Sequence, residues 1–189
     1  MVFYAYFTGA STAQSILREE EERTLPRLFT TPTSQAAILT GKFLSVFMTV
    51  CTQVIVLIIA AQLIFGIQCG SFLSVASMAA GIIFSASSFG IFINSFLKST
   101  RQGGVLFGGI LTVTGMLGMI SVFVINSPSA ARMGETVSLL VPQGWAVRGL
   151  TQSMNGQPLN EVLITMLISF LWSAAFFLIG VWRFNKRYT

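Results

Sequence analysis

Long apolar runs separated by short polar segments set the pattern of this chain. Four such runs occupy residues 43–67, 72–97, 105–125 and 162–182. A helix needs about 20 consecutive apolar residues to cross the hydrocarbon core of a bilayer. The pattern therefore predicts four full transmembrane helices.

A shorter apolar stretch, residues 2–17, precedes the first charged segment. It is shorter than a complete span, and it lacks the positively charged start that is typical of a signal peptide. We interpret it as the last part of a further transmembrane helix. On this interpretation the chain is the C-terminal portion of a longer protein.

The composition also indicates a membrane protein. The chain of 189 residues is 53% hydrophobic and only 9% charged, with a mean hydropathy of +0.78. Charged residues make up about 25% of a typical soluble domain, whereas residues 43–97 contain none. We therefore expect an all-α fold, a polytopic helical membrane protein built as a single domain over residues 1–189.

The basic residues predict how the chain lies in the membrane. Nine of the eleven Lys and Arg residues fall within residues 18–42, 98–101 and 183–187, which the alternation of spans places on one side. Arg132 and Arg148 remain for the other side. Because Lys and Arg concentrate in cytoplasmic loops, we expect the first side and the C-terminus to be cytoplasmic. Nucleic-acid binding is not expected, because the cations lie at the ends of apolar runs, where they serve as topology anchors.

Small residues gather in two of the predicted spans. The second full run is rich in Ser, Ala and Gly, and the third begins with Gly104-x-x-x-Gly108 and continues with Gly115 and Gly118. In lipid, small residues let helix backbones approach closely. We expect both helices to pack tightly, either within the chain or, for the Gly104–Gly108 pair, against a second chain.

The segment 18–42 carries eight of the seventeen charged residues of the chain. Such a segment must lie in water, because charges inside the bilayer are costly. Within it, Leu25, Leu28 and Phe29 are clustered around Pro26 at helical spacing. A short helix that presents Leu and Phe to the cytoplasm predicts a docking surface for a soluble partner. Packing of these side chains on the protein's own helices is the alternative.

The outer segment, residues 126–160, is too long for a simple turn. Its apolar residues recur at helical spacing before Pro142, at Met133, Val137 and Leu140, and another apolar stretch begins with Trp145 after it. We expect two short amphipathic helices that lie at, or dip into, the outer leaflet, with Pro142 ending the first. An ordinary loop is the alternative. Arg132 and Arg148 in this segment suit lipid headgroups or an anionic substrate.

The order of residues in segment 18–42 resembles a motif of the ABC-2 type permeases, the membrane subunits of ABC exporters. The matching residues read Glu21-Glu22-Arg23-Thr24-Leu25-Pro26-Arg27-Leu28, then Thr31-Pro32, Ile38 and Gly41-Lys42. In that family this stretch carries the coupling helix, which docks on the ATPase subunit. The resemblance therefore implies ATPase docking by Glu22, Thr24, Leu25, Leu28, Phe29, Thr31 and Pro32.

Two residues depart from the family pattern, and both lie at the start of the coupling helix. Arg23 stands where the family usually has Gly, and Pro26 stands where an acidic or polar residue is common. The stretch from Leu140 to Leu150 resembles the short external helices of the family. The resemblance thus runs from the end of the family's second span, which corresponds to residues 2–17, to its sixth span, which corresponds to residues 162–182.

The resemblance implies a transmembrane domain like that of type V exporters. The chain would be a permease subunit that exports an apolar or amphiphilic substrate, of the drug or lipid class, along residues 2–17 and 105–125. ATP and Mg would bind a separate ABC ATPase subunit, because Ala36 and Phe43 break the phosphate-binding pattern around Gly41-Lys42. A second permease subunit, identical or paralogous, and membrane lipids are the other expected partners. The expected location is a bacterial or archaeal cytoplasmic membrane.

Other classes of protein fit the sequence less well. An ion-coupled transporter usually has ionisable residues inside its spans, and the four full runs contain none. An intramembrane protease needs a general base or metal ligands, and the chain has neither His nor Asp. A truncated, non-transporting relic, or an assembly protein that binds an ATPase, is the alternative to a working permease.

Overall fold

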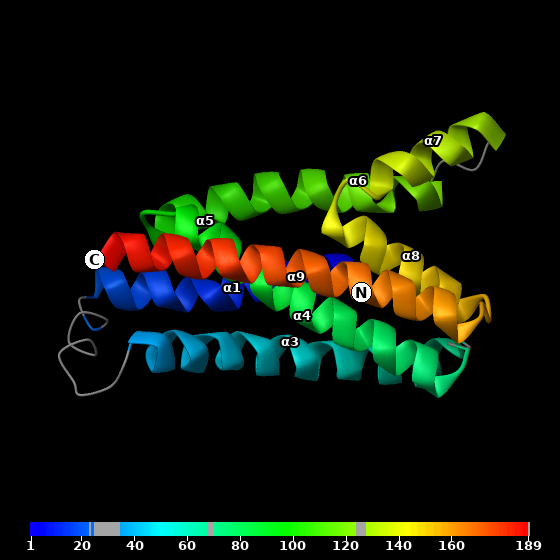
Figure 1. Ribbon diagram of the computed structural model, residues 1–189, viewed down its shortest axis with the longest axis horizontal. Helices are drawn as coiled ribbons and strands as arrows, with labels where there is room; N and C mark the ends of the chain where they lie inside the picture. Colours follow the sequence, from blue (N-terminus) through cyan, green and yellow to red (C-terminus); the bar gives the residue numbers. More distant parts are fainter. Residues whose placement is uncertain (23, 25–34, 68–69, 124–127, 189) are drawn as a thin grey trace.

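The computed structural model describes residues 1–22, 24, 35–67, 70–123 and 128–188, and the regular structure in these ranges is helical, without strands. Figure 1 shows the helices as a bundle of long, roughly parallel rods. In chain order they are α1 (Val2–Glu21), α3 (Gln35–Phe65), α4 (Phe72–Phe96), α5 (Thr100–Leu106), the π-helix η1 (Phe107–Leu111), α6 (Thr112–Phe123), α7 (Pro128–Ser138), α8 (Pro142–Met154) and α9 (Leu159–Tyr188). The all-α fold is confirmed.

Four helical stretches of the described chain are long and apolar enough to cross a membrane. They are Thr40–Phe65, Phe72–Phe96, Thr100–Phe123 and Leu159–Phe184, which confirms the four full spans. Their ends form two groups (Figure 1). At the charged end, α1, α4 and α9 finish and α3 and α5 begin. At the opposite end, which we call the hairpin end, α7 contacts α6, and α8 lies between α6 and α9.

Helix α4 is the central helix because its small residues let its neighbours approach closely. In its apolar window 72% of the residues are buried, against at most 28% in the other three spans. A Cβ atom on Gly90 of α4 would overlap the backbone of Gly9 in α1, and a Cβ atom on Gly9 would overlap the carbonyl of Ala86. The close packing expected for this span is confirmed.

Hydrogen bonds between helices connect α4 to α1 and α9 inside the bundle. They join Tyr6 Oη with Ser85 Oγ (2.6 Å), Asn94 Nδ2 with the Ala10 carbonyl (2.9 Å) and Ser88 Oγ with Ser173 Oγ (2.8 Å). Polar groups in lipid need such internal partners, because no water competes for them. The bonds therefore orient the three helices in addition to the apolar packing.

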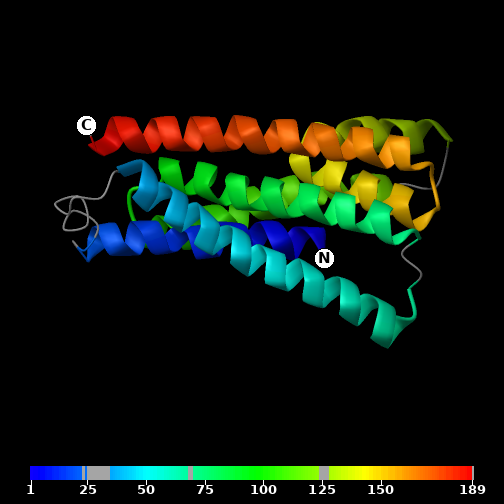
Figure 2. The same cartoon turned by 60° about the horizontal axis from the view of Figure 1, so that its bottom comes forward.

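Helix α3 covers one edge of the bundle and diverges from α4 toward its C-terminal end (Figure 2). Near its start, Phe43 packs on Phe177 of α9, with ring centroids 4.9 Å apart. Near its end, Leu63, Ile64 and Phe65 are 80%, 73% and 74% exposed. Exposure of large apolar side chains is expected where the surrounding solvent is lipid.

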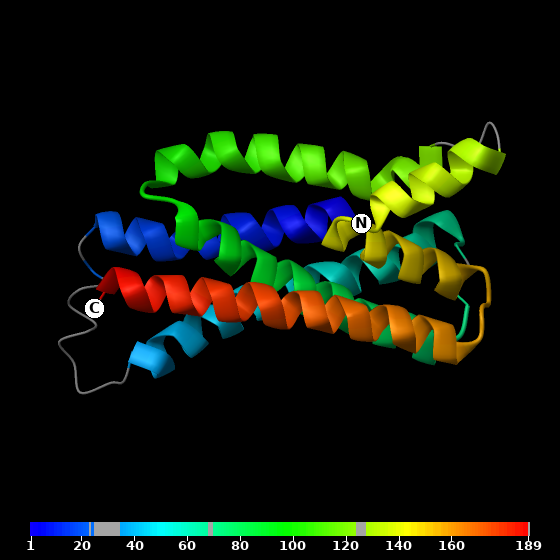
Figure 3. The same cartoon turned by 45° about the horizontal axis from the view of Figure 1, so that its top comes forward.

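The span formed by α5, η1 and α6 lies along the opposite edge, beside α1 (Figure 3). Its glycines differ in their surroundings. Gly115 contacts Phe3 of α1 and Gly118 contacts α8, but nothing lies within 4 Å of a Cβ atom on Gly104 or Gly108. Packing within the chain is therefore correct for Gly115 and Gly118. Among the described residues, Gly104 and Gly108 have no such neighbour, so packing of this pair against a second chain stays a prediction.

Candidate functional site

An ion pair at the charged end joins the two ends of the 18–42 segment. Lys42 Nζ of α3 contacts Glu19 Oε1 of α1, and the exposed fractions of the two side chains are only 23% and 28%. Thr24 Oγ1 also donates to the Glu19 carbonyl at 3.0 Å. A partly buried pair is screened by salt less than an exposed one. The pair therefore holds α1 and α3 together at the base of the segment.

A second set of contacts connects the end of α1 to the start of α5. The Glu21 carboxylate accepts hydrogen bonds from Thr100 N at 2.9 Å and from Thr100 Oγ1 at 2.7 Å. Gln14 Nε2 donates to the Thr100 carbonyl at 2.6 Å. The side-chain bond, followed by the backbone bond, lowers the pKa of Glu21 below its ordinary value. A carboxylate here also favours the helix, because it lies against the positive end of the α5 dipole.

Only two of the predicted docking residues belong to the described part of the chain. Glu22 is exposed and lies 3.4 Å from Arg18, an exposed pair that adds little stability. Thr24 makes the contact with Glu19 described above. The other predicted docking residues, Leu25, Leu28, Phe29, Thr31 and Pro32, lie outside the described residues. Their role in docking stays a prediction.

At the hairpin end, α7 and α8 form a helical hairpin whose turn lies nearer the middle of the bundle than its open ends (Figures 1 and 3). Trp145 Nε1 donates to the Leu139 carbonyl across the turn at 2.8 Å. A Cβ atom on Gly144 would overlap the Ser138 carbonyl. Pro142 does not end the first helix as expected: α7 ends at Ser138 and Pro142 begins α8. Proline suits this first position because no helical partner is lost there.

The two helices of the hairpin are buried to different degrees. Met133 of α7 is 70% exposed, and Val137 of the same helix is half-buried. Leu140, which follows the end of α7, is 71% exposed. Pro142 is buried and Trp145 is half-buried. Helix α8 packs on α4, α6 and α9, with Gln143, Gly144, Ala146, Gly149 and Ser153 buried. It is therefore part of the bundle and does not lie flat on a membrane surface.

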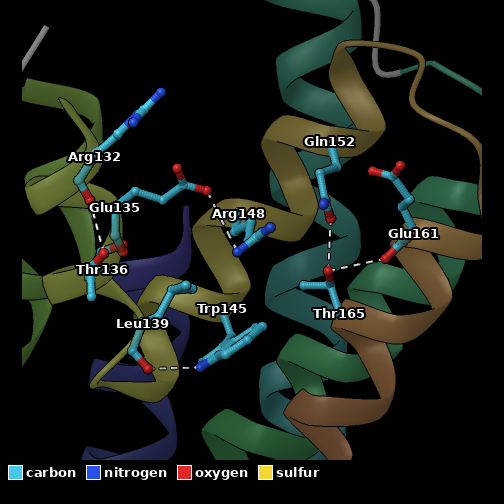
Figure 4. Close-up of polar contacts among 10 residues, drawn as sticks. Arg132, Glu135, Thr136, Leu139, Trp145, Arg148, Gln152, Glu161 and Thr165 are labelled. Carbon is cyan, nitrogen blue, oxygen red and sulfur yellow. Dashed lines mark hydrogen bonds and ion pairs between the residues drawn. The ribbon is translucent and has the colours of Figure 1, made fainter. Parts of the chain in front are cut away.

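A polar pocket of about 550 Å³ lies between α6, α7, α8 and the start of α9. Across it, Glu135 Oε1 and Arg148 Nη1 are 3.6 Å apart, and the Arg148 guanidinium lies 5.8 Å from the centre of the Trp145 ring. Figure 4 shows Arg132 on one side of this pair and Glu161 on the other. Both of these residues also line the pocket.

A second, apolar pocket of about 660 Å³ lies where the start of α1 faces α6. Its lining includes Phe3 of α1 and Met116, Met119 and Phe123 of α6. Flexible Met side chains and aromatic rings adapt to irregular apolar shapes. This pocket can therefore accept apolar groups of varied form.

The protein is a multi-pass integral membrane protein. It has four apolar spans, a charged end where side-chain contacts join the helix termini, and a re-entrant helical hairpin. Comparison with known families identifies its kind. The sequence matches the family described as ABC-2 family transporter protein over residues 1–182. The chain belongs to this family and is an ABC-2 type permease. This is the family that the motif in residues 18–42 indicates.

The chain is also similar to a curated bacterial protein. It is 23% identical over 181 residues to the linearmycin resistance permease protein LnrN of Bacillus subtilis (strain 168). The match covers 95% of this chain and 46% of the relative, so the chain spans about half the length of that relative. No solved structure matches the chain.

Sequence reasoning predicted the charged segment but missed the contacts that fasten it. Glu19 and Lys42 are 23 residues apart, and Glu21 and Thr100 are 79 residues apart, so no rule of local spacing links them. A signal exists for the first pair, because opposite charges stand at the facing ends of adjacent helices. Nothing in the sequence indicates that Glu21 bonds to Thr100.

Proposed function

We propose that this chain is a permease subunit of an ATP-driven ABC-2 exporter, coupled through residues 18–42 to a separate ABC ATPase subunit. Membership of the ABC-2 family supports such a partner. The observation that carries the coupling proposal is the set of contacts at the charged end. Through Glu19, Lys42 and Glu21 the base of the segment is joined to α1, α3 and α5 at once.

In the proposed mechanism, force on the segment moves three helices together. ATP and Mg would bind the ATPase subunits, whose closure would push on Leu25, Leu28 and Phe29. The push would reach α1 and α3 at the two ends of the segment, and α5 through the bond between Glu21 and Thr100. A ligand shifts a conformational equilibrium only by its difference in affinity for the two states. ATP would therefore favour the outward-facing state, and substrate the inward-facing state.

The proposed substrate is apolar or amphiphilic, of the drug or lipid class. The apolar pocket between α1 and α6 supports this class, because Phe3, Met116 and Met119 offer no charge to bind an ion. The similar B. subtilis permease is named for resistance to linearmycin, which is consistent with a role in efflux.

A second permease subunit, identical or paralogous, would pack on the edge formed by α5, η1 and α6. The open space at Gly104 and Gly108 supports this, because small residues let a second helix approach closely. The charged end, with the C-terminus, would face the cytoplasm of a bacterial or archaeal cell, because basic residues concentrate there. Membrane lipids would surround the remaining exposed apolar faces.

Co-purification from membranes tests the coupling. We expect an ABC ATPase subunit to co-purify with the wild-type chain. The double substitution Leu28→Asp with Phe29→Asp is expected to lower its recovery about tenfold or more, because charges placed in an apolar contact are costly. The matched control, Thr151→Asp with Asn155→Asp, adds the same charges at exposed positions of the hairpin end. Equal ATPase recovery with both double variants would contradict the docking assignment.

A non-transporting protein that binds an ATPase is the second candidate, because docking contacts alone do not require transport. Reconstitution of the co-purified complex in vesicles separates the two. ATP-dependent movement of an amphiphilic dye, with dye-stimulated hydrolysis, supports the permease. ATPase binding without either activity supports the second candidate.

A further inference from the structure

The polar pocket at the hairpin end contains charges that the proposed function does not use. We call it the hairpin pocket, and its charged and amide side chains are Arg132, Glu135, Arg148, Gln152, Asn155, Gln157 and Glu161. Glu135 and Arg148 pair with each other. The Arg132 guanidinium and the Glu161 carboxylate have no ion-pair or hydrogen-bond partner within the described ranges, where the two residues form hydrogen bonds through backbone atoms only.

The arrangement of these charges selects a particular kind of ligand. Figure 4 shows Arg132 of α7 and Glu161 of α9 on opposite flanks of the Glu135–Arg148 pair. Among the residues that the structure describes, the hairpin pocket thus has an unpaired cation on one side, an unpaired anion on the other and no net charge. Gln152 Oε1 accepts from Thr165 Oγ1 at 2.8 Å, which leaves its NH2 group as a donor. A ligand with one negative and one positive group matches this pattern.

The position of the hairpin pocket indicates where such a ligand comes from. The pocket lies where two spans end, next to Phe123 of α6 and to the start of α9. Span ends lie at the level of the lipid headgroups. Val122, which lines the pocket, and the adjacent Phe123 are 45% and 70% exposed. An apolar surface therefore continues from the polar pocket toward the hydrocarbon core.

We propose that the hairpin pocket binds the headgroup of a zwitterionic phospholipid, with its phosphate at Arg132 and its amine at Glu161. A guanidinium binds phosphate through paired hydrogen bonds, and a carboxylate pairs with an ammonium group. An anionic lipid without an amine would satisfy Arg132 but leave Glu161 without a partner. This inference goes beyond the proposed function and requires neither ATP nor an ATPase.

A structural role alone is the competing account of Glu161. The carboxylate lies in the first turn of α9, where it favours the helix through the dipole. That role predicts an effect of substitution on thermal stability but no effect on lipid preference. Lipid preference is therefore the property to measure.

Native mass spectrometry of the purified full chain, with equimolar phosphatidylethanolamine and phosphatidylglycerol, measures this preference. We expect the wild-type chain to retain more phosphatidylethanolamine. Glu161→Gln is expected to lower the ratio of the two retained lipids about three- to fivefold, and Arg132→Gln to weaken both. The controls Glu22→Gln and Arg101→Gln remove the same charges at the charged end and are expected to leave the ratio unchanged.

A charge reversal and a soluble competitor complete the test. Glu161→Lys places a cation in the amine position and is expected to reverse the preference toward phosphatidylglycerol. An unchanged ratio in both Glu161 variants, or a wild type that retains more phosphatidylglycerol than phosphatidylethanolamine, would overturn the proposal. Glycerophosphoethanolamine carries the same headgroup without acyl chains. Displacement of the lipid by this compound at equal concentration would overturn the lipid as the source of the headgroup.

Discussion

Single glycine residues decide how closely α1 and α4 approach each other. Gly90 of α4 lies against the backbone of Gly9 in α1, and this close approach brings the Ala10 carbonyl within reach of Asn94. Asn94 Nδ2 donates both to that carbonyl and to the Gly90 carbonyl of its own helix, at 2.9 and 2.8 Å. A glycine and an asparagine one turn apart thus make one interhelical contact.

The substitution Gly90→Ala tests this contact. Its Cβ atom would overlap the Gly9 backbone, so we expect the thermal unfolding midpoint of the purified chain to fall, by an amount equivalent to about 1–3 kcal/mol. The matched control is Gly41→Ala in α3, where nothing lies within 4 Å of the new Cβ. There we expect stability to be unchanged or to rise by up to about 1 kcal/mol, because alanine favours a helix. Equal midpoints for Gly90→Ala and wild type would contradict the α1–α4 packing.

At the scale of elements, side-chain contacts at the charged end join three helices to one another. The Glu19–Lys42 pair joins α1 with α3, and the Glu21–Thr100 bonds join α1 with α5. Because Glu21 has a lowered pKa in the folded protein, these bonds stabilise the fold above the ordinary Glu pKa. Their contribution is lost as the pH falls through the lowered folded value. At neutral pH the bonds between Glu21 and Thr100 are therefore in place.

Charge reversal tests the connection between α1 and α3. Glu19→Lys and Lys42→Glu each place two like charges together, and we expect each to lower ATP-dependent transport about fivefold, with ATPase co-purification retained. The combined variant restores opposite charges and is expected to recover most of the activity. If the combined variant is no more active than the single ones, the pair does not couple these helices.

At the scale of the whole molecule, the chain has two chemically different ends. One end gathers most of the basic residues, and the other has a re-entrant hairpin with a polar pocket. Between them, α4 is surrounded by α1, α3, α8 and α9. This polarity defines which end faces the cytoplasm in the proposed orientation.

Cysteine labelling tests that orientation. After Cys51 and Cys69 are replaced by Ala, Lys98→Cys and Asn155→Cys each place one exposed thiol at a different end. With a membrane-impermeant maleimide on intact cells, we expect labelling of the Asn155→Cys variant only, because basic residues favour the cytoplasm. Both variants should react after the membrane is disrupted. Labelling of only the Lys98→Cys variant in intact cells would reverse the proposed orientation.

The sequence by itself determined the spans, the all-α class and the family. The length of an apolar run and the order of residues in segment 18–42 depend only on residues that are close together in the sequence. Only the tertiary structure decided that Gly90 meets α1, that Glu21 bonds to Thr100 and that Pro142 begins a helix at an inward turn. These features depend on which residues far apart in the chain come into contact. In lipid that choice is made by local shape and hydrogen bonding, because apolar side chains gain little by leaving one apolar surrounding for another.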